Sequence, residues 1–477
     1  MAPTAPVVVV GGGIAGLAAA WDLVGLGVPV TVVEADGRLG GKIRTQPFAG
    51  VDLDRGADAF VVRAPEDVWL CREVGLADRL VPSAAATASV WARGRLRRLP
   101  AGLVLGVPTA PLPLARSRIL SPLGMVRAGL DLVVPPRRGA GDNDEAVGKL
   151  VRRRLGAQAH ELLVDPLVGG INAGDSDRLS LAVTAPALAD AARHRSLVLG
   201  ARALRRTQVT GGPAAAPASW SLAGGLGTLV ARLARRLGDA GARVRTATRA
   251  EALVADGDGW VVEVTGTRGV PDRLGAAAVV LATPAHATAE LLAPLVPEAA
   301  ATLAGVEHAS VAVVAMAYPP GALRRPPGDS GFLVPRREGW LMTACSWASA
   351  KWPHLAVPGQ ELLRVSAGRH RDPRPLDLDD GPLVERLHHE LDQVVGATTG
   401  PSAWAVTRWE RAFPQFAPGH LRRVAGVEAA LAARLPGLAL AGAAVSGAGI
   451  PACIASGRRA AASVGPRAGA AARHARR

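Results

Sequence analysis

The sequence has few of the residues that cross-link a chain or stack on nucleic-acid bases. Of its 477 residues only Cys71, Cys345 and Cys453 are cysteines, and no two of them form a C-x-x-C pair. A disulfide framework is therefore excluded, and we expect no metal site. Tyrosine occurs once and phenylalanine five times, too few for a base-stacking platform. Helix-turn-helix, zinc-finger and RNP motifs are also missing, so we expect no nucleic-acid partner despite the net charge of +15.

An uninterrupted hydrophobic run that could span a membrane is missing as well. The most apolar stretch, residues 435–457, has no charged residue but contains Pro436, Gly442 and Pro451 among other helix breakers. In lipid these would leave backbone groups unpaired, so a buried strand, loop and helix is expected instead. No secretory signal is visible, because the apolar start of the chain has the pattern of a strand. We therefore expect a cytoplasmic protein, and its length predicts two or more domains.

The N-terminal stretch has the pattern of a dinucleotide-binding unit. Val7 to Val10 predict a buried parallel strand, which runs into Gly11-x-Gly13-x-x-Gly16 and then into a helical pattern. These glycines permit a tight turn, close approach of a pyrophosphate and close packing of helix on strand. A second strand ends at Glu34, where a carboxylate can bind a ribose hydroxyl. The predicted pyrophosphate-binding residues are Gly11, Gly12, Gly13, Ile14, Ala15 and Gly16.

The residues after Glu34 narrow the cofactor to FAD. They follow the pattern Glu-x-x-x-Arg-x-Gly-Gly, in which Arg38 can neutralise a phosphate. This extension is typical of FAD-binding, amine-oxidase-like enzymes, and NAD-dependent dehydrogenases lack it. Residues 51–60 then resemble the strand and Gly-Ala loop that lie along the flavin in those enzymes. The cofactor residues expected in this part are Glu34, Ala35, Arg38, Gly41, Lys42, Gly56, Ala57, Asp58 and Ala59.

The rest of the chain leaves the nucleotide domain and returns to it. Proline-rich and helical patterns fill the part from residue 96 to 218, and residues 242–254 predict a strand that rejoins the first sheet. Arginine clusters at 93–98, 137–138 and 152–154 are either ordinary solvated surface or a basic face for anionic lipid or a polycarboxylate. We expect an FAD-binding domain of residues 1–95, 219–305 and 400–464, a mainly helical and membrane-associating insertion of residues 96–218, a substrate-binding domain of residues 306–399, and a disordered basic tail of residues 465–477.

Motifs spread along the chain resemble those of one flavoprotein family. Residues 165–175 (Asp-Pro-Leu-Val-Gly-Gly-Ile-Asn-Ala-Gly-Asp) are similar to its Pro-Leu-x-x-Gly-x-x-x-Gly-Asp signature, and residues 414–420 to its Pro-Gln-Tyr-x-x-Gly-His. Residues 440–457 match its closing flavin motif. The order and spacing hold over nearly the whole chain. The sequence therefore resembles the FAD-dependent, oxygen-using protoporphyrinogen and coproporphyrinogen III oxidases.

This resemblance implies an α/β fold: a Rossmann-like FAD-binding domain of the amine-oxidase (GR2) type, a mixed-sheet substrate domain and a helical insertion. It implies that hydride passes from a porphyrinogen to non-covalent FAD in three rounds, that oxygen takes the electrons and forms hydrogen peroxide, and that ferrochelatase receives the product of this heme-biosynthesis step downstream. It assigns no catalytic side chain. The Ala- and Arg-rich composition suits a high-GC actinobacterium, for which the family implies coproporphyrinogen III as substrate. Further cofactor residues expected are Ala250, Trp409, Gly442, Ala443, Ala448, Gly449 and Ile450, and the substrate residues expected are Gly170 and Asn172.

The sequence departs from the family pattern at Asn172 and Phe416, which are often Tyr, and at Ala452, which is frequently Asp. These changes are expected at the pocket edge or at a helix start. Three alternatives stay open: a protoporphyrinogen IX oxidase, another flavin amine oxidase or desaturase, and a non-catalytic basic binder with a flavin fold. We also expect His388 and His389 on the surface, and His420 and Cys453 in structural roles.

Overall fold

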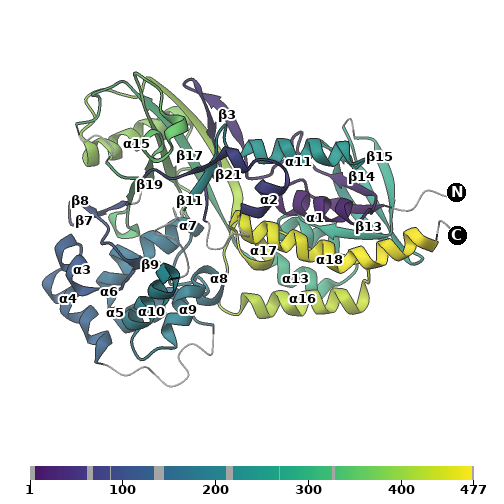
Figure 1. Cartoon of the computed structure of the whole chain (residues 1–477), viewed down its shortest axis with the longest axis horizontal. Helices are drawn as coiled ribbons and strands as arrows, with labels where there is room; N and C mark the ends of the chain where they lie inside the picture. The colour runs from purple at the N-terminus through teal and green to yellow at the C-terminus, as the bar shows by residue number, and fades with distance from the viewer. Residues whose placement is uncertain are drawn as a thin grey trace.

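The computed structural model describes residues 6–61, 68–85, 87–133, 144–210, 219–267, 269–324 and 328–474. The strand of the nucleotide-binding motif belongs to a parallel sheet, and α1 (Ile14–Gly25) and α18 (Ile450–His474), which cover this sheet, are labelled in Figure 1. Every neighbouring pair in this sheet is parallel. In spatial order its strands are β12 (Arg243–Arg245), β2 (Val30–Val33), β1 (Val7–Val10), β16 (Ala278–Leu281) and β22 (Leu438–Leu440).

The sequence of β1 follows from its burial on both faces. Val7 and Val9 belong to one hydrophobic cluster, and Val8 and Val10 belong to another on the opposite side. A strand covered on both sides has no polar face, which explains four consecutive valines in place of an alternating pattern. The predicted strand is therefore confirmed.

Each face of the parallel sheet has its own cover. One face is packed by α1 (Ile14–Gly25), α11 (Gly227–Asp239) and the long α18 (Ile450–His474). Figure 1 shows α1 and α18 running side by side. The approach of these two helices is close, because a Cβ at Gly457 would lie 2.1 Å from the carbonyl oxygen of Ala15. The other face is packed by α12 (Ala285–Leu292), α13 (Pro297–Ala304), α16 (His420–Arg434) and the antiparallel sheet of β13 (Arg249–Asp256), β14 (Gly259–Thr265) and β15 (Pro271–Ala276).

The prediction of a single strand at residues 242–254 is wrong, since the structure has two strands there. β12 does join the parallel sheet beside β2, as expected. The chain then turns at Ala247, whose φ is +48°, and continues as β13 in the antiparallel sheet. The amides of Ala247 and Thr248 donate to the carbonyl oxygens of Asp36 and Glu34. These tertiary hydrogen bonds fix the turn, and no local sequence pattern announces them.

A large mixed sheet stands against the nucleotide-binding part. The helix α15 (Asp380–Val395) packs on this sheet. Residues 89–92 and 403–414 pair within it, although the expected boundaries assigned them to the FAD-binding domain. So do residues 95–98, which straddle the expected boundary with the helical insertion. The division into domains stays a prediction. In spatial order its strands are β21 (Ala403–Pro414), β17 (His308–Tyr318), β20 (Glu361–Ala367), β19 (Met342–Trp347), β18 (Gly331–Leu333), β7 (Ser89–Ala92) and β8 (Arg95–Arg98).

Helices gather between the strands β8 and β11 (Ser219–Leu222) around a hydrophobic cluster of their own. They lie at the lower left of Figure 1. One of them, η4 (His160–Gly169), is a π-helix that carries the start of the Asp165–Asp175 motif. The others are α3 (Pro111–Ser117), α4 (Pro122–Gly129), η3 (Leu130–Leu132), α5 (Val147–Leu155), α6 (Ala157–Ala159), α7 (Gly170–Asn172), α8 (Leu181–Thr184), α9 (Pro186–Ala192) and α10 (Leu197–Thr210).

Smaller elements complete the architecture. They are the hairpins β3 (Thr45–Phe48) with β4 (Val51–Asp54) and β9 (Leu103–Val104) with β10 (Val107–Pro108), the sheet of β5 (Phe60–Val61), β11 and β6 (Leu80–Pro82), and the short helices α2 (Trp69–Glu73), η2 (Ala77–Arg79), η5 (Arg336–Glu338), α14 (Ala348–Lys351), η6 (Pro353–Leu355) and α17 (Ala443–Ser446).

The C-terminal segment differs from the expected disordered tail. The backbone of residues 465–474 continues α18 to His474, and residues 475–477 lie outside the described residues. The many alanines here have the highest helix propensity, which favours continuation of the helix. None of the helices in the described part of the chain combines the length and the apolar character needed to cross a membrane.

Candidate active site

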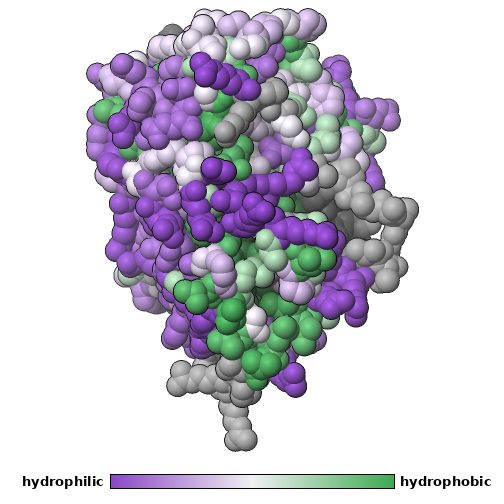
Figure 2. Space-filling model, turned by 90° about the vertical axis from the view of Figure 1, so that its left-hand side faces the viewer, coloured by the Kyte–Doolittle hydropathy of each residue, from purple (hydrophilic) through white to green (hydrophobic). Residues whose placement is uncertain are grey.

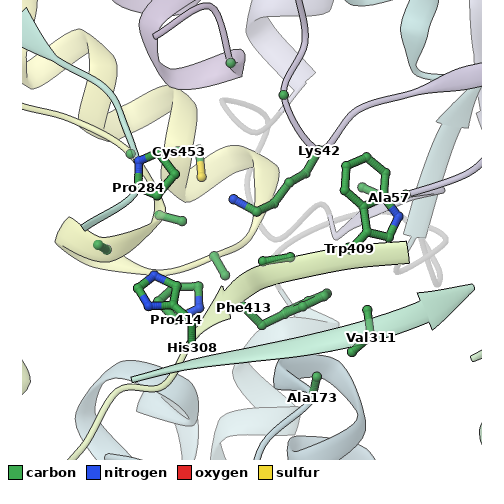
Figure 3. Close-up of a pocket in the computed structure, with 18 of the residues that line it drawn as sticks. Lys42, Ala57, Ala173, Pro284, His308, Val311, Trp409, Phe413, Pro414 and Cys453 are labelled. Atoms are coloured by element: carbon green, nitrogen blue, oxygen red, sulfur yellow. The ribbon is translucent and has the colours of Figure 1, made fainter. Parts of the chain in front are cut away.

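A cavity of about 760 Å³ lies where the parallel sheet faces the large mixed sheet. One end is lined by residues at the carboxyl ends of β1, β2, β16 and β22, the edge at which parallel α/β sheets bind ligands. The other end is lined by the Asp165–Gly174 segment and by strands of the mixed sheet. Figure 3 shows side chains from these distant segments converging on one space.

The glycine loop after β1 has the geometry that its sequence predicts. Gly11 has φ +108°, and a Cβ there would lie 2.7 Å from the carbonyl oxygen of Ala282. A Cβ on Gly16 would lie 1.9 Å from the carbonyl oxygen of Gly11, so helix α1 packs on the loop without room for a side chain. Gly13 is the N-cap of α1 and has open space where its Cβ would be. The loop therefore presents bare backbone and a helix N-terminus to the cavity, which suits a pyrophosphate.

Glu34 and Arg38 hold the backbone around this end. The Glu34 carboxylate accepts hydrogen bonds from the amides of Gly12 (2.7 Å) and Asp36 (2.8 Å), and the residue lines the cavity. Arg38 does not line the cavity, although we expected it to contact a phosphate. Its guanidinium donates to the carbonyl oxygens of Leu39, Gly41 and Ile43, because the tight turn points these groups inward. Arg38 therefore shapes the loop that borders the cofactor site.

The loop after β4 lies against the mixed sheet. Gly56 has no space for a side chain, since a Cβ would lie 2.1 Å from the carbonyl oxygen of Lys42 and 2.9 Å from the Trp409 ring. Trp409 Nε1 donates to the carbonyl oxygen of Arg55 at 2.9 Å, which fixes the indole along the cavity wall. Figure 3 shows Trp409 close to Ala57. This wall consists of one aromatic face and a loop of small residues, an arrangement that leaves room for a planar ring system.

Two buried groups border the space between these walls. Burial lowers the pKa of Lys42 and raises the pKa of the Cys453 thiol to about 11. Figure 3 shows the Lys42 amine directed toward the side on which Cys453 lies. The thiol stays protonated at neutral pH, and its Sγ lies 3.8 Å from the carbonyl oxygen of Gly447. Cys453 is thus a packed residue, as expected.

The glycine-rich C-terminal stretch supplies the opposite wall. Gly442 has φ +111°, and its amide donates to Ser456 Oγ at 2.9 Å within α18. The backbone then reaches the start of α18 at Ile450, which lines the cavity together with Ala448 and Gly449. His420 is buried, does not line the cavity, and bonds through Nε2 to the carbonyl oxygen of Ala444 at 2.7 Å. Its structural role is as expected.

The far end of the cavity contains the motif residues that were expected to contact substrate. Gly170 and Asn172 both line it. The Asn172 side-chain amide donates from Nδ2 to the carbonyl oxygen of Val168 at 2.8 Å. The backbone carbonyl oxygen of Asn172 accepts from Gln415 Nε2 at 3.0 Å. Phe416, expected at the pocket edge, is instead fully buried against the His420 ring at 4.9 Å. Its aromatic ring fills the core, so the missing tyrosine hydroxyl changes nothing in the cavity wall.

The cavity also contains functional groups that sequence reasoning missed. They lie on strands of the mixed sheet and on the loops that follow these strands. The sequence of such a strand does not show which of its two faces will line the cavity. A charged residue inside an apolar strand, as at Arg364, was the available signal. Burial, together with the charge of His286 at an edge-to-face distance of 5.2 Å, lowers the pKa of His308 to about 4. The missed residues include His308, Val311, Arg336, Thr343, Arg364, Ser366 and Arg369.

Most of the predicted site residues meet in this one cavity. The exceptions are Gly12, Gly16 and Arg38, which do not line the cavity and instead contact the backbone of the loops that do. Their contacts to a cofactor stay predictions, as do those of the lining residues. The predicted residues that line the cavity are Gly11, Gly13, Ile14, Ala15, Glu34, Ala35, Gly41, Lys42, Gly56, Ala57, Asp58, Ala59, Gly170, Asn172, Ala250, Trp409, Gly442, Ala443, Ala448, Gly449 and Ile450.

Comparison with known proteins agrees with this geometry. Residues 14–465 match the family described as flavin containing amine oxidoreductase. The chain therefore belongs to this family of FAD-dependent oxidoreductases. The glycine cradle around Gly13 and Gly56, which a Cβ would fill or distort, fits the cofactor of the family.

Within the family, the chain groups with the porphyrinogen oxidases. It is 34% identical to the coproporphyrinogen III oxidase of Bacillus subtilis, over 95% of this chain and 96% of that protein. It is 36% identical to the coproporphyrinogen III oxidase of Propionibacterium freudenreichii, over 95% of this chain and 89% of that protein. A crystal structure of a putative protoporphyrinogen oxidase from Exiguobacterium superposes with a TM-score of 0.84 at 29% identity, covering 97% and 99% of the two chains.

Proposed function

We propose that this enzyme oxidises coproporphyrinogen III to coproporphyrin III in heme biosynthesis, with oxygen as the electron acceptor and hydrogen peroxide as the second product. The observation that carries the proposal is the identity of 34% and 36%, along 95% of the chain, to two enzymes named for this activity. The cavity supports it, since one space joins the dinucleotide loop to an end that contains arginines.

FAD, when bound, supplies the two-electron acceptor for this chemistry. The residues of the chain bind and orient it: the Gly11–Gly16 loop at the pyrophosphate, Glu34 at the ribose, and the Gly56–Ala59 loop with Trp409 along the ring system. Attachment is proposed to be non-covalent, because the Cys453 thiol at the cavity is protonated and packed. His308, with a pKa of about 4, is neutral at pH 7, so it is the arginines that supply permanent positive charge to the cavity wall.

Aerobic turnover of coproporphyrinogen III and protoporphyrinogen IX by the FAD-loaded enzyme tests the substrate. Porphyrin fluorescence and peroxide formation are followed together, with boiled enzyme as the control for autoxidation. We expect a higher kcat/KM for coproporphyrinogen III. Preference for protoporphyrinogen IX would support the alternative of a protoporphyrinogen IX oxidase. A bovine protoporphyrinogen oxidase is 31% identical to this chain. No turnover of either substrate would reject the porphyrinogen oxidase.

An amine oxidase is the weaker candidate. The single tyrosine of the chain, Tyr318, is fully buried, bonds to His388 at 2.9 Å, and does not line the cavity. The aromatic wall therefore depends on Trp409 and Phe413, with no tyrosine to complete a cage around an amine. We expect no peroxide above background when aliphatic amines replace the porphyrinogen.

We also propose peripheral contact with the inner face of the cell membrane, from which the product would pass to ferrochelatase. Large apolar side chains are exposed on α3, α4 and η3, and Figure 2 shows apolar residues gathered on the lower part of this face below a hydrophilic band. Exposed arginines at positions 93, 95, 116 and 118 favour anionic headgroups. The apolar surface consists of Leu112 (57% exposed), Leu123 (82%), Val126 (66%), Leu130 (42%), Leu132 (37%) and Val133 (73%).

The arginines at 152–154 do not contribute to this basic face. Each has a carboxylate partner, and Arg154 is buried. These ion pairs favour the alternative without lipid contact for residues 152–154, and we leave them out of the surface proposed to meet the membrane. The second expected cluster, Arg137 and Arg138, lies outside the described residues. The ion pairs join Arg152 to Glu161 and Asp177, Arg153 to Glu145, and Arg154 to Asp131.

A further inference from the structure

Two arginines line the end of the cavity opposite the dinucleotide loop. Arg336 begins the turn η5, three residues after the end of β18 at Leu333. One residue, Gly368, separates Arg369 from the end of β20, and its φ of +89° turns the chain there. Both arginines are partly buried, and both line the cavity beside the Asp165–Gly174 segment. Segments far apart in sequence thus bring two positive charges to one wall.

The positive charge of this pair is only partly compensated by carboxylates of the chain. In the described part of the chain, neither Arg336 nor Arg369 has a carboxylate within ion-pair distance. Asp165 lines the same end and its negative charge raises the pKa of Arg369, but it forms no ion pair with either arginine, and its Oδ1 accepts from the Ser176 hydroxyl at 2.6 Å. The other carboxylates around this end are ion-paired elsewhere: Glu161 with Arg152 and Arg337, Glu307 with His370 and Arg371, and Asp372 with Arg374.

The two guanidiniums are also available for hydrogen bonding. Arg336 donates from Nη2 to the carbonyl oxygen of Gly174 at 2.8 Å, which orients it, while its buried Nε has no partner in the described structure. Burial, followed by the charge of Arg336, lowers the pKa of Arg369 to about 10, and the nearby carboxylates of Asp165 and Asp372 offset this only in part. That direction indicates that Arg369 faces a like charge in a partly desolvated place. An anion bound between the two guanidiniums would offset both their mutual repulsion and the desolvation of their charges.

We propose that Arg336 and Arg369 bind a carboxylate side chain of the porphyrinogen and so fix the orientation of the macrocycle in the cavity. The inference rests on the proposed function and adds the residues that recognise the substrate. A guanidinium offers a planar fork of donors that matches a carboxylate, and charge-assisted hydrogen bonds of this kind are about twice as strong as neutral ones. The propionates of coproporphyrinogen III have this chemistry.

Binding of the oxidised product separates the charge effect from the shape of the cavity. The FAD-loaded enzyme is titrated with coproporphyrin III and with its tetramethyl ester, which has the same ring and no carboxylates, and porphyrin fluorescence reports binding. We expect Arg369→Met to weaken binding of the acid about tenfold or more, the range of a hydrogen bond to a charged group. Binding of the ester should be unchanged. Arg369→Lys should restore part of the affinity for the acid.

The matched control is Arg337→Met, since Arg337 is next to Arg336 but exposed, paired with Glu161 and outside the cavity lining. It should bind the acid as wild type does. FAD content of each variant is measured in parallel. Equal affinity of wild type and Arg369→Met for the acid would overturn the inference, and so would equal weakening of acid and ester. A wild-type enzyme that binds no coproporphyrin would instead overturn the proposed function on which the inference rests.

Discussion

Arg364 of strand β20 bonds to both ends of the loop that carries Asp58. Its Nη1 lies 2.7 Å from Asp58 Oδ2, and its Nη2 donates to the carbonyl oxygen of Gly56 at 2.6 Å. Lys351 adds a second cation at 3.2 Å from the same carboxylate. Burial opposes ionisation of Asp58, but the two cations outweigh it and hold the pKa of Asp58 below its usual range. The mixed sheet therefore positions a loop of the nucleotide-binding part.

Replacing Arg364 should loosen that loop. For Arg364→Met we expect a loss of about 2–4 kcal/mol in the free energy of unfolding, because the partly buried Asp58 carboxylate loses its closest cation and keeps only the longer contacts to Lys351 and Trp352. FAD retention should fall as well. Urea unfolding and the flavin content of the purified protein measure the two effects. Arg273→Met is the control, since the pair of Arg273 with Glu263 is exposed and contributes about 0–1 kcal/mol. An equal loss in both variants would contradict the assigned role.

Gly13→Ala should separate cofactor binding from folding. The space beyond Gly13 is open in the protein, so the added methyl group meets no protein atom within 4 Å and the apoprotein should keep its stability to within about 1 kcal/mol. That space is the proposed place of the pyrophosphate, and we expect FAD affinity to fall about tenfold or more. Flavin fluorescence titration of the apoprotein measures it. Gly25→Ala, which also meets nothing within 4 Å, should leave affinity unchanged. Unaltered FAD affinity of Gly13→Ala would place the pyrophosphate elsewhere.

The His308 imidazole should make stability depend on pH in one direction. Its pKa of about 4 in the folded protein is below the ordinary value of 6.5, so protons bind the unfolded chain preferentially. The stability it contributes is present above pH 6.5 and is lost as pH falls toward 4. Between pH 6.5 and 5 this amounts to at most about 2 kcal/mol. Urea unfolding across this range should show a smaller decline for His308→Gln than for wild type. The exposed His389→Gln should decline like wild type.

The exposed apolar surface on α4 should govern membrane contact. We expect wild-type enzyme to sediment with vesicles that contain anionic lipid, and salt to weaken this binding by screening the arginines. Leu123→Ser combined with Val126→Ser should reduce binding several-fold without altering turnover, because both side chains are exposed and outside the cavity. Val270→Ser, an exposed apolar residue on a distant loop before β15, is the control. No binding at low salt, or equal loss in all variants, would leave the surface without a lipid role.

The sequence alone determined the parts of this protein that are local along the chain. The strand, glycine loop and helix of residues 7–25 are contiguous, and each step is dictated by a short pattern: β-branched residues on a doubly buried strand, then glycines where backbone approaches backbone. The same holds for Arg38 to Gly41, whose spacing indicated FAD, and for the closing stretch from Gly442. Even here the spacing did not predict which groups Arg38 contacts, since its guanidinium donates to carbonyl oxygens of its own loop.

Tertiary structure decided what contiguous patterns cannot encode. A buried strand does not tell which neighbour it faces, so the inward position of Arg364, Arg369 and His308 became visible only when the mixed sheet closed over the nucleotide site. The arginines at 152–154 form a charge run in sequence, but in the fold each forms an ion pair with a carboxylate of another segment. Local backbone preference follows from adjacent residues, whereas burial, charge pairing and the shape of a cavity depend on segments that only folding brings together.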